Sequence, residues 1–468
     1  MIFLIVGLRI FGNIILNVDI DSSLSFMYES SATVLEEDDL SQYSKDTLQY
    51  LVADKNLYDG YKIIKDNNFK SNSWQGYVIT DGVINQNIAC MNESKYINKD
   101  NDIYEECKKE LDKNLTYVKD GNWKYFVNLE IDEAKSTKAM LEAQLELAET
   151  EDEKDDIKDQ IESANNVITA NEYRLKYEIP ASYSMKSNLV NSYVTNAQMW
   201  EQVQHDESII NKHEDLYNKR LVEKNYYVSK YQLEEDIIPE SEGFISSQNY
   251  LVSAFTSAGF FMIILIIVLG STTVADEFNK GTVKQLLLKP YTRTKILFSK
   301  YLSCLIVFLM FIIGSLFVYT IIDGIFFGFS DIFKPIVEYN FHTGKVIEIN
   351  TFVYCLINFL CVLPHYLILF TVGFLASILL ENSVVGIIIP LVLNTFGDLI
   401  TALIPKNLER LSAIMPSNCW ELNDFLFGGL AENQYSSLGL SLVVDIVLIV
   451  VMLVVSVILF KKKDIKNQ

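Results

Sequence analysis

Five long apolar stretches, separated by polar segments, dominate the C-terminal half of this chain. They are about 21 to 29 residues long. At about 1.5 Å of rise per helical residue, each is long enough to cross a hydrocarbon core roughly 30 Å thick. Together with a shorter apolar stretch at the N-terminus, they predict an α-helical integral membrane protein. Its six spans are expected at residues 1–18, 251–275, 296–322, 352–380, 384–404 and 438–460.

The N-terminal stretch is the least regular of the six, because Arg9 lies in its middle. A lone arginine at the centre of a spanning helix costs about 2.5–3.5 kcal/mol unless it faces water or other helices. A cleaved signal peptide is an alternative to a first span, although a positively charged start and an Ala-x-Ala-like cleavage site are both missing. A start codon placed too late, which would remove a cytoplasmic leader, is a second alternative.

Lysine and arginine residues determine the expected orientation of the spans. The positive-inside rule places basic loops and tails in the cytoplasm. The tail at 461–468 and the segment at 276–295 are both basic, and the alternation of spans puts both on the same side. We therefore expect a cytoplasmic turn at 381–383 and extracellular segments at 19–250, 323–351 and 405–437.

The expected extracellular segment at 19–250 is strongly acidic. It has 46 acidic and 24 basic residues, a net charge of −22, whereas the rest of the chain has 14 acidic and 15 basic residues. Such a surface repels phosphate backbones, so we expect no nucleic-acid partner. The acidic runs at 36–39 and 234–236 are more often a solvated face than a site for cationic peptides or divalent ions.

Helical periodicity is clearest at 128–178, which contains no glycine or proline. Apolar residues recur there at spacings of three and four, typical of a coiled coil, but the two halves are out of phase. We expect an antiparallel hairpin that turns near Glu151 to Asp155; one long helix with a stutter is the alternative. Residues 75–84 instead suggest a small β-hairpin around Asp81-Gly82. The extracellular segment is thus expected to be a helix-rich α+β domain, in which Cys90 and Cys107 could pair.

The sequence has few features of an enzyme. It contains neither the Gly-x-x-x-x-Gly-Lys-Ser/Thr phosphate loop nor a His-Glu-x-x-His zinc motif. No Cys-x-x-Cys pair or histidine-rich ligand set is present either. We therefore expect no enzyme activity, no cofactor and no structural metal in this chain itself.

The basic segment at 276–295 has the features of a docking element. An apolar face is expected at Val283, Leu286 and Leu287 on a short helix that Thr282 caps and Pro290 ends. Gly281 permits the bend out of the preceding span, and Thr292 or Thr294 can cap the next helix. A plain cytoplasmic loop that only obeys the positive-inside rule is the alternative.

Among the ionisable residues within the expected spans, three are candidates for a function in the membrane. Asp398 is in the fifth span, Asp445 is in the sixth, and His365 follows Pro364 in the fourth. Ionisable groups at membrane depth are rare and often functional, so these residues are candidates for a transport pathway. Both aspartates lie toward the expected outer ends of their helices, where hydrogen bonding between helices or contact with water is the simpler interpretation.

The pattern Glu277-x-x-x-Gly281-Thr282-Val283-Lys284-x-x-Leu287-x-x-Pro290-x-Thr292-Arg293-x-x-Ile296 resembles the region between the second and third spans of ABC-2 type transporter permeases. That family has a six-span bundle with both ends in the cytoplasm, and a Gram-positive branch carries a large extracellular helical insertion after the first span. The resemblance implies a permease coupled to a separate ABC ATPase subunit, present in two copies. It also implies a homodimer, or a heterodimer with a second permease, within the lipid bilayer. The residues to which it assigns ATPase coupling are Glu277, Gly281, Thr282, Val283, Lys284, Leu287, Pro290 and Arg293.

A function of another class remains open. A non-transporting surface or secretion-associated scaffold, similar to phage-infection proteins, would share the pattern of spans and act through its extracellular domain. Co-purification of an ATPase subunit would distinguish the two functions, because only a permease requires one.

Overall fold

A computed structural model describes residues 20–37, 40–205, 213–238, 247–256, 259–280, 282, 290–405 and 408–462. The chain divides into two compact units. The first unit contains Met1–Glu201 and Ser229–Pro239, and the second contains Gln202–Val228 and Glu240–Gln468. The expected first span, 1–18, lies outside the described residues.

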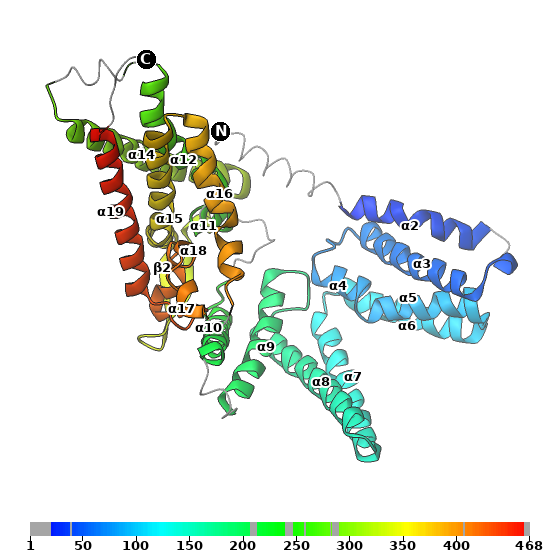
Figure 1. Ribbon diagram of the computed structural model, residues 1–468. Helices are drawn as coiled ribbons and strands as arrows, with labels where there is room; N and C mark the ends of the chain where they lie inside the picture. The colour runs from blue at the N-terminus through cyan, green and yellow to red at the C-terminus, as the bar shows by residue number, and fades with distance from the viewer. Residues whose placement is uncertain are drawn as a thin grey trace. The chain divides into compact units, whose positions relative to one another are not determined.

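The described part of the first unit is built from helices (Figure 1). A core of buried side chains, among them Ile64, Ile79, Ile84, Leu111 and Phe126, joins its α3, α4, α5, α6 and α7. The helices are α2 (Ile20–Glu37), α3 (Lys45–Asp66), α4 (Trp74–Thr80), α5 (Val83–Glu93), α6 (Asn101–Lys119), α7 (Trp123–Leu147), α8 (Glu151–Tyr177) and α9 (Met185–His205), with short turns of helix at Leu40–Gln42 and Ser94–Asn98.

The β-hairpin expected at 75–84 is wrong, because these residues form the end of α4, a turn at Asp81-Gly82 and the start of α5. Ser73 caps α4 by accepting a hydrogen bond from the Gly76 backbone N–H at 3.3 Å. Val78, Ile79 and Ile84 are buried, so the β-branched residues pack into a helical core. The described part of 19–250 contains no strand, which makes it helical rather than α+β.

The helical hairpin expected at 128–178 is present as α7 and α8, which lie side by side along their length (Figure 1). The turn comes at 148–150, slightly before the expected position. Thr150 begins α8 by accepting a hydrogen bond from the Glu153 backbone N–H at 3.2 Å. An acidic first turn at Glu151, Asp152 and Glu153 favours the helix start, where the helix dipole is positive.

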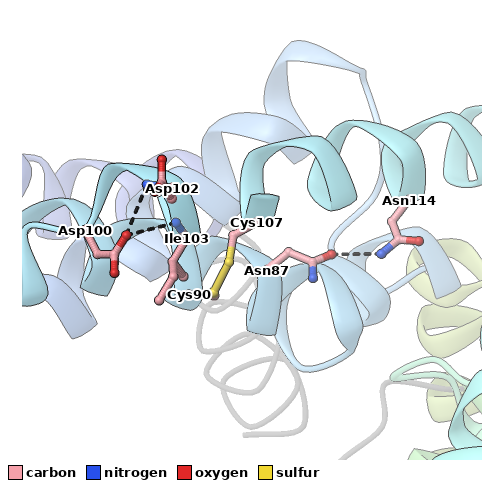
Figure 2. The surroundings of a disulfide bond; sticks show 7 residues. All are labelled: Asn87, Cys90, Asp100, Asp102, Ile103, Cys107 and Asn114. Carbon is pink, nitrogen blue, oxygen red and sulfur yellow. Dashed lines mark hydrogen bonds between the residues drawn. A yellow bond between two sulfur atoms is a disulfide. The ribbon is translucent and has the colours of Figure 1, made fainter. Parts of the chain in front are cut away.

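A disulfide joins Cys90 in α5 to Cys107 in α6, with the two Cα atoms 6.0 Å apart (Figure 2). Around it, Asp100 caps α6 by accepting from the backbone N–H groups of Asp102 and Ile103, both at 3.1 Å. A hydrogen bond of 2.8 Å between the side chains of Asn87 and Asn114 connects the same two helices. The pairing that the sequence left open is therefore formed.

The second unit contains five described helices that are long and apolar enough to cross a membrane. These candidate spans cover Met262–Asn279, Arg293–Ile325, Thr351–Leu380, Ser383–Ala402 and Leu438–Lys462. They lie in α12 (Phe260–Asn279), α14 (Arg293–Phe327), α15 (Thr351–Leu380), α16 (Ser383–Ala402) and α19 (Leu438–Lys462). The protein is therefore mostly helical, and its C-terminal half is that of a multi-pass membrane protein.

The candidate spans assemble around α15. In its most apolar stretch of 18 residues, 61% of the residues are buried. It packs against α12, α16 and α19 (Figure 1). Phe370 and Phe374 of α15 are fully buried beside Tyr301 of α14. Gly270 allows α12 to approach closely, since a Cβ there would lie 2.5 Å from the Phe370 carbonyl oxygen.

The span expected at 251–275 differs from the structure at both ends. Two helices, α11 (Ser247–Thr256) and α12, replace one, and Gly259 is the N-cap of α12. α12 then continues through Asp276 and Glu277, which were expected in the following loop. Both carboxylates have partners there, which allows the helix to extend beyond its apolar part.

Shorter elements connect the candidate spans. Strands β1 (Pro335–Asn340) and β2 (Lys345–Asn350) form an antiparallel pair within 323–351, with Pro335 opposite Asn350. The helices α17 (Glu409–Ser412) and α18 (Pro416–Cys419) and the turn at Asn423–Gly428 lie between α16 and α19. The helix α10 (His213–Glu234) precedes α11, and the boundary between the two units falls within it.

Candidate functional site

The beginning of segment 276–295 is bound to the start of α14. Glu277 Oε1 forms an ion pair with Lys300 Nζ at 2.7 Å, and the two side chains are only 26% and 22% exposed. Lys300 Nζ also donates to the Thr273 carbonyl oxygen at 3.3 Å. The Thr282 hydroxyl donates to Glu277 Oε2, so the carboxylate is held from both sides.

The same end of α12 is also bound to the turn between α15 and α16. Ser383 Oγ donates to Asp276 Oδ1 at 2.8 Å and accepts from Asn279 Nδ2 at 3.3 Å. Asn382 holds this turn in place, because its side chain accepts from the backbone N–H groups of Val384 and Val385. The last turn of α12 is therefore connected to α16 as well as to α14.

The far end of segment 276–295 contacts α19. The Arg293 Nη1 atom donates to the Lys461 carbonyl oxygen at 3.0 Å. Arg293 is the first residue of α14, and the preceding Thr292 caps the helix by accepting from the Lys295 backbone N–H at 3.4 Å. Of the two caps predicted, Thr292 or Thr294, the structure shows Thr292, and exposed Pro290 lies just before it.

Four of the residues expected to couple to an ATPase, Gly281, Val283, Lys284 and Leu287, lie outside the described residues. The other four, Glu277, Thr282, Pro290 and Arg293, lie at the two ends of the segment. The partners Ser383, Lys461 and Lys300 were not foreseen. The short inside turn at 381–383 was a signal for Ser383, because a polar turn between two spans must lie near the ends of neighbouring spans.

His365 is buried among polar and aromatic groups. Its Nδ1 lies 3.2 Å from Glu421 Oε1, and its Nε2 lies 2.8 Å from Asn394 Oδ1. The imidazole ring stacks on Trp420 with ring centroids 4.0 Å apart. This arrangement joins α15 to α16 and to the segment after α18.

The two candidate aspartates lie in different surroundings. Asp398 is exposed on α16, one turn beyond Asn394. Asp445 is only 2% exposed on α19, and neither of its carboxylate oxygens has a hydrogen-bond partner among the described residues. Its neighbour Cys419 lies outside the candidate spans; burial, followed by the charge of Asp445, raises the pKa of the Cys419 thiol to about 11.

A cavity of about 350 Å³ lies between α10, β1, the start of α15 and the Asn423–Gly428 turn. Within it, Glu338 forms an ion pair with Lys224 at 2.6 Å and accepts from the Tyr354 hydroxyl at 3.0 Å. Burial raises the pKa of the Asp424 carboxyl, and the nearby Glu421 and Glu432 carboxylates raise it further. This cavity was not predictable from the sequence, because its walls come from four separate parts of the chain.

The described residues contain no cluster of three or more histidine, cysteine, aspartate or glutamate side chains arranged to hold a metal ion. The clearest arrangement is instead a set of contacts that connects segment 276–295 to neighbouring helices. Both ends of segment 276–295 are bound to helices that are candidate spans, through Glu277 to α14, Asp276 to α16 and Arg293 to α19.

Comparison with known proteins places the second unit in a family. Residues 216–466 match the family model described as "Protein of unknown function (DUF2705)". "Uncharacterized protein YhcI" of Bacillus subtilis (strain 168) is 26% identical over 278 residues, which are 58% of this chain and 82% of YhcI. No solved structure is significantly similar to this chain. Because the match covers more than half of the chain, including the five candidate spans, the chain belongs to the DUF2705 family.

Proposed function

We propose that this protein is the membrane-spanning permease subunit of an ABC-2 type exporter, driven by ATP hydrolysis in a separate subunit. The observation that carries the proposal is the anchoring of segment 276–295 at both ends to α14, α16 and α19. A segment that binds a soluble ATPase must pass its movement to the spans. The anchoring supplies that connection, and it supports the resemblance to ABC-2 permeases.

In this function, movement of an ATPase subunit shifts the segment and, with it, the last turn of α12. The Glu277–Lys300 pair transmits the shift to α14, and the Asp276–Ser383 hydrogen bond transmits it to α16. Two permease subunits, identical or different, would enclose the transport pathway. The apolar surfaces of α16 and α19 remain exposed in one chain and would face lipid or the second subunit.

The proposed orientation places the acidic N-terminal segment outside the cell and segment 276–295 in the cytoplasm. The Cys90–Cys107 disulfide supports this orientation, since disulfides persist in oxidising compartments and are rare in the cytosol. The basic residues on either side of Pro290 and in the tail after α19 support it independently.

The test is whether an ATPase subunit co-purifies with the protein and whether ATP then changes the dynamics of the candidate spans. Purified from native membranes, the full chain should bring with it a subunit that contains a phosphate loop, identified by mass spectrometry, and the complex should hydrolyse ATP. In that complex, ATP should change hydrogen exchange in α14 and α16. Replacing Gly281 with tryptophan should remove this response while membrane insertion remains intact.

Reversal of one charge pair makes the test more specific. Glu277→Lys should abolish the ATP response of α14, because two cations would then face each other at a half-buried site. The double variant Glu277→Lys with Lys300→Glu should restore most of it. An unchanged response in the single variant, or an ATPase subunit that never co-purifies, argues against the coupling role.

A second candidate function is a scaffold that acts through the N-terminal unit. The disulfide and the separate core of that unit favour it, because they give the unit a stable structure of its own. A scaffold requires no ATPase, so stable full-length protein that purifies without any ATPase subunit would support this function over transport.

A further inference from the structure

The first unit contains a hollow that the transport proposal does not use. It has a volume of about 530 Å³ and lies between the α4–α5 turn and the α7–α8 hairpin. Ligand sites commonly have volumes of about 300–1,000 Å³. Its lining on α7 runs from Phe126 to Leu141, which corresponds to roughly 22 Å of helix. The hollow is therefore an elongated groove.

The floor of this groove is apolar. The side chains of Val78, Phe126, Ala134, Leu141 and Ala164 line it, and all five are buried. Val167 of α8 lies on the lining as well but is 43% exposed. Of these six side chains, Val167 leaves the most apolar surface open to solvent, and a ligand that covers it gains hydrophobic stabilisation.

Three carboxylates, those of Asp81, Glu130 and Glu133, line the same groove, whereas no lysine or arginine does. None of the three forms a salt bridge with any described residue. Glu130 Oε2 accepts from Asn171 Nδ2 at 2.9 Å, and Asp81 Oδ2 accepts from the Thr80 hydroxyl at 3.2 Å. The groove therefore combines an apolar floor with a net negative charge.

The carboxylates of the groove destabilise the folded first unit when no ligand is bound. Burial raises the pKa of Glu130, which means that the folded unit disfavours its charged form, although Asn171 and Arg174 partly oppose this effect. The like charges of Glu133 and Glu130 repel each other. A ligand that brings positive charge and an apolar face would relieve the repulsion and cover the floor together.

We propose that this groove binds a cationic amphiphilic peptide. Charge complementarity selects a cation, the apolar floor selects an apolar face, and the length along α7 selects an extended chain molecule over a compact one. A metal ion fits poorly, because the described residues, including the carboxylates of this groove, contain no group of three or more histidine, cysteine, aspartate or glutamate side chains that could hold one. The proposal does not depend on transport, since the groove lies wholly within the first unit.

Binding can be measured on the full chain in nanodiscs of zwitterionic lipid, with empty nanodiscs as the reference. The probe is a fluorescently labelled amphipathic peptide of lysine and leucine, followed by anisotropy. The variants Asp81→Asn and Glu133→Gln should each lower the affinity roughly two- to five-fold, and added salt should lower it further.

The matched control is Glu146→Gln, which removes the same charge from an exposed position of α7 outside the groove. It should bind the peptide with unchanged affinity. Val167→Arg places a cation and extra bulk at an exposed lining position and should also weaken binding. Equal affinity in the groove variants and in Glu146→Gln would overturn the proposal, as would equally tight binding of a peptide made of glutamate and leucine.

Discussion

Among the described residues, Asp445 has a buried side chain whose surroundings leave it unsatisfied. Its carboxylate is 2% exposed on α19, and both oxygens lack hydrogen-bond partners among the described residues. An unsatisfied buried polar group costs about 1–3 kcal/mol. Asp445→Leu, which replaces the carboxylate with an apolar side chain, should therefore raise the free energy of unfolding by about that amount. Thermal unfolding in detergent measures the change.

Ser456 on the same helix supplies the control. Its hydroxyl is also fully buried but donates to the Met452 carbonyl oxygen at 2.8 Å. Ser456→Ala should lower stability by about 1 kcal/mol or less, because it removes a satisfied hydrogen bond. If Asp445→Leu destabilises the protein as much as or more than Ser456→Ala, Asp445 has a stabilising partner and the expectation is wrong.

Glu130 should make the first unit less stable as the pH rises. Burial raises the pKa of this carboxyl above its ordinary value of 4.5, so the folded state retains a proton that the unfolded state has lost. The cost is absent below pH 4.5 and reaches its full size above the raised pKa. The charged and polar groups that face it, Arg174, Asn171 and Glu133, do not cancel this effect.

The difference in stability between Glu130→Gln and the original protein isolates this effect from other titrations. Near neutral pH the variant should be the more stable of the two, and the advantage should shrink as the pH falls toward 4.5. Denaturant unfolding at several pH values measures it. A stability difference that does not vary with pH would show that the pKa of Glu130 is not raised.

At the scale of the element, the disulfide between α5 and α6 should set the local stability of the helix pair. The two cysteines are 17 residues apart, and closing a loop of this size stabilises a fold by about 3 kcal/mol. Replacing both Cys90 and Cys107 with alanine should therefore speed amide exchange in α5 and α6 by roughly 100-fold. Hydrogen exchange followed by mass spectrometry measures this.

The free cysteine Cys304 in α14 is the natural comparison, since Cys304→Ala removes a thiol without breaking a cross-link. Exchange in α5 and α6 should remain unchanged in that variant. Equal exchange in the double alanine variant and the original protein would mean that hydrogen bonds such as Asn87–Asn114 suffice to hold the pair.

Elements with a strong, regular hydrophobic pattern were predictable from the sequence. The five candidate spans and the α7–α8 hairpin follow such patterns, because length and periodicity determine what a helix can bury. The error at 75–84 arose because β-branched residues favour strands locally, whereas burial of Ile79 and Ile84 in a helical core decides the outcome. The β1–β2 pair was missed because each of its strands has only six residues and both lie in a loop between two spans.

The candidate site was predictable only in part. A local motif identified Glu277 and Arg293, and Thr292 was recognisable as a cap. The partner of Asp276, Ser383, and the partner of Arg293, Lys461, are more than 100 residues away from them in the sequence. Nothing in a single sequence pairs such distant residues, since the contacts arise only when the helices pack. The acidic groove has the same origin, because α4, α5, α7 and α8 form it together.

In the whole molecule, each part of the chain should lie on a defined side of the membrane. Glu146 is exposed on α7, and the Lys280 side chain is 70% exposed at the end of α12. The four free cysteines, Cys304, Cys355, Cys361 and Cys419, are first changed to alanine. A single cysteine is then introduced at position 146 or at position 280. A membrane-impermeant maleimide should label Glu146→Cys on intact cells, and should label Lys280→Cys only after permeabilisation, because basic segments stay in the cytoplasm. The reverse labelling pattern would place segment 276–295 outside, where no cytoplasmic ATPase could reach it, and would refute both the orientation and the proposed coupling.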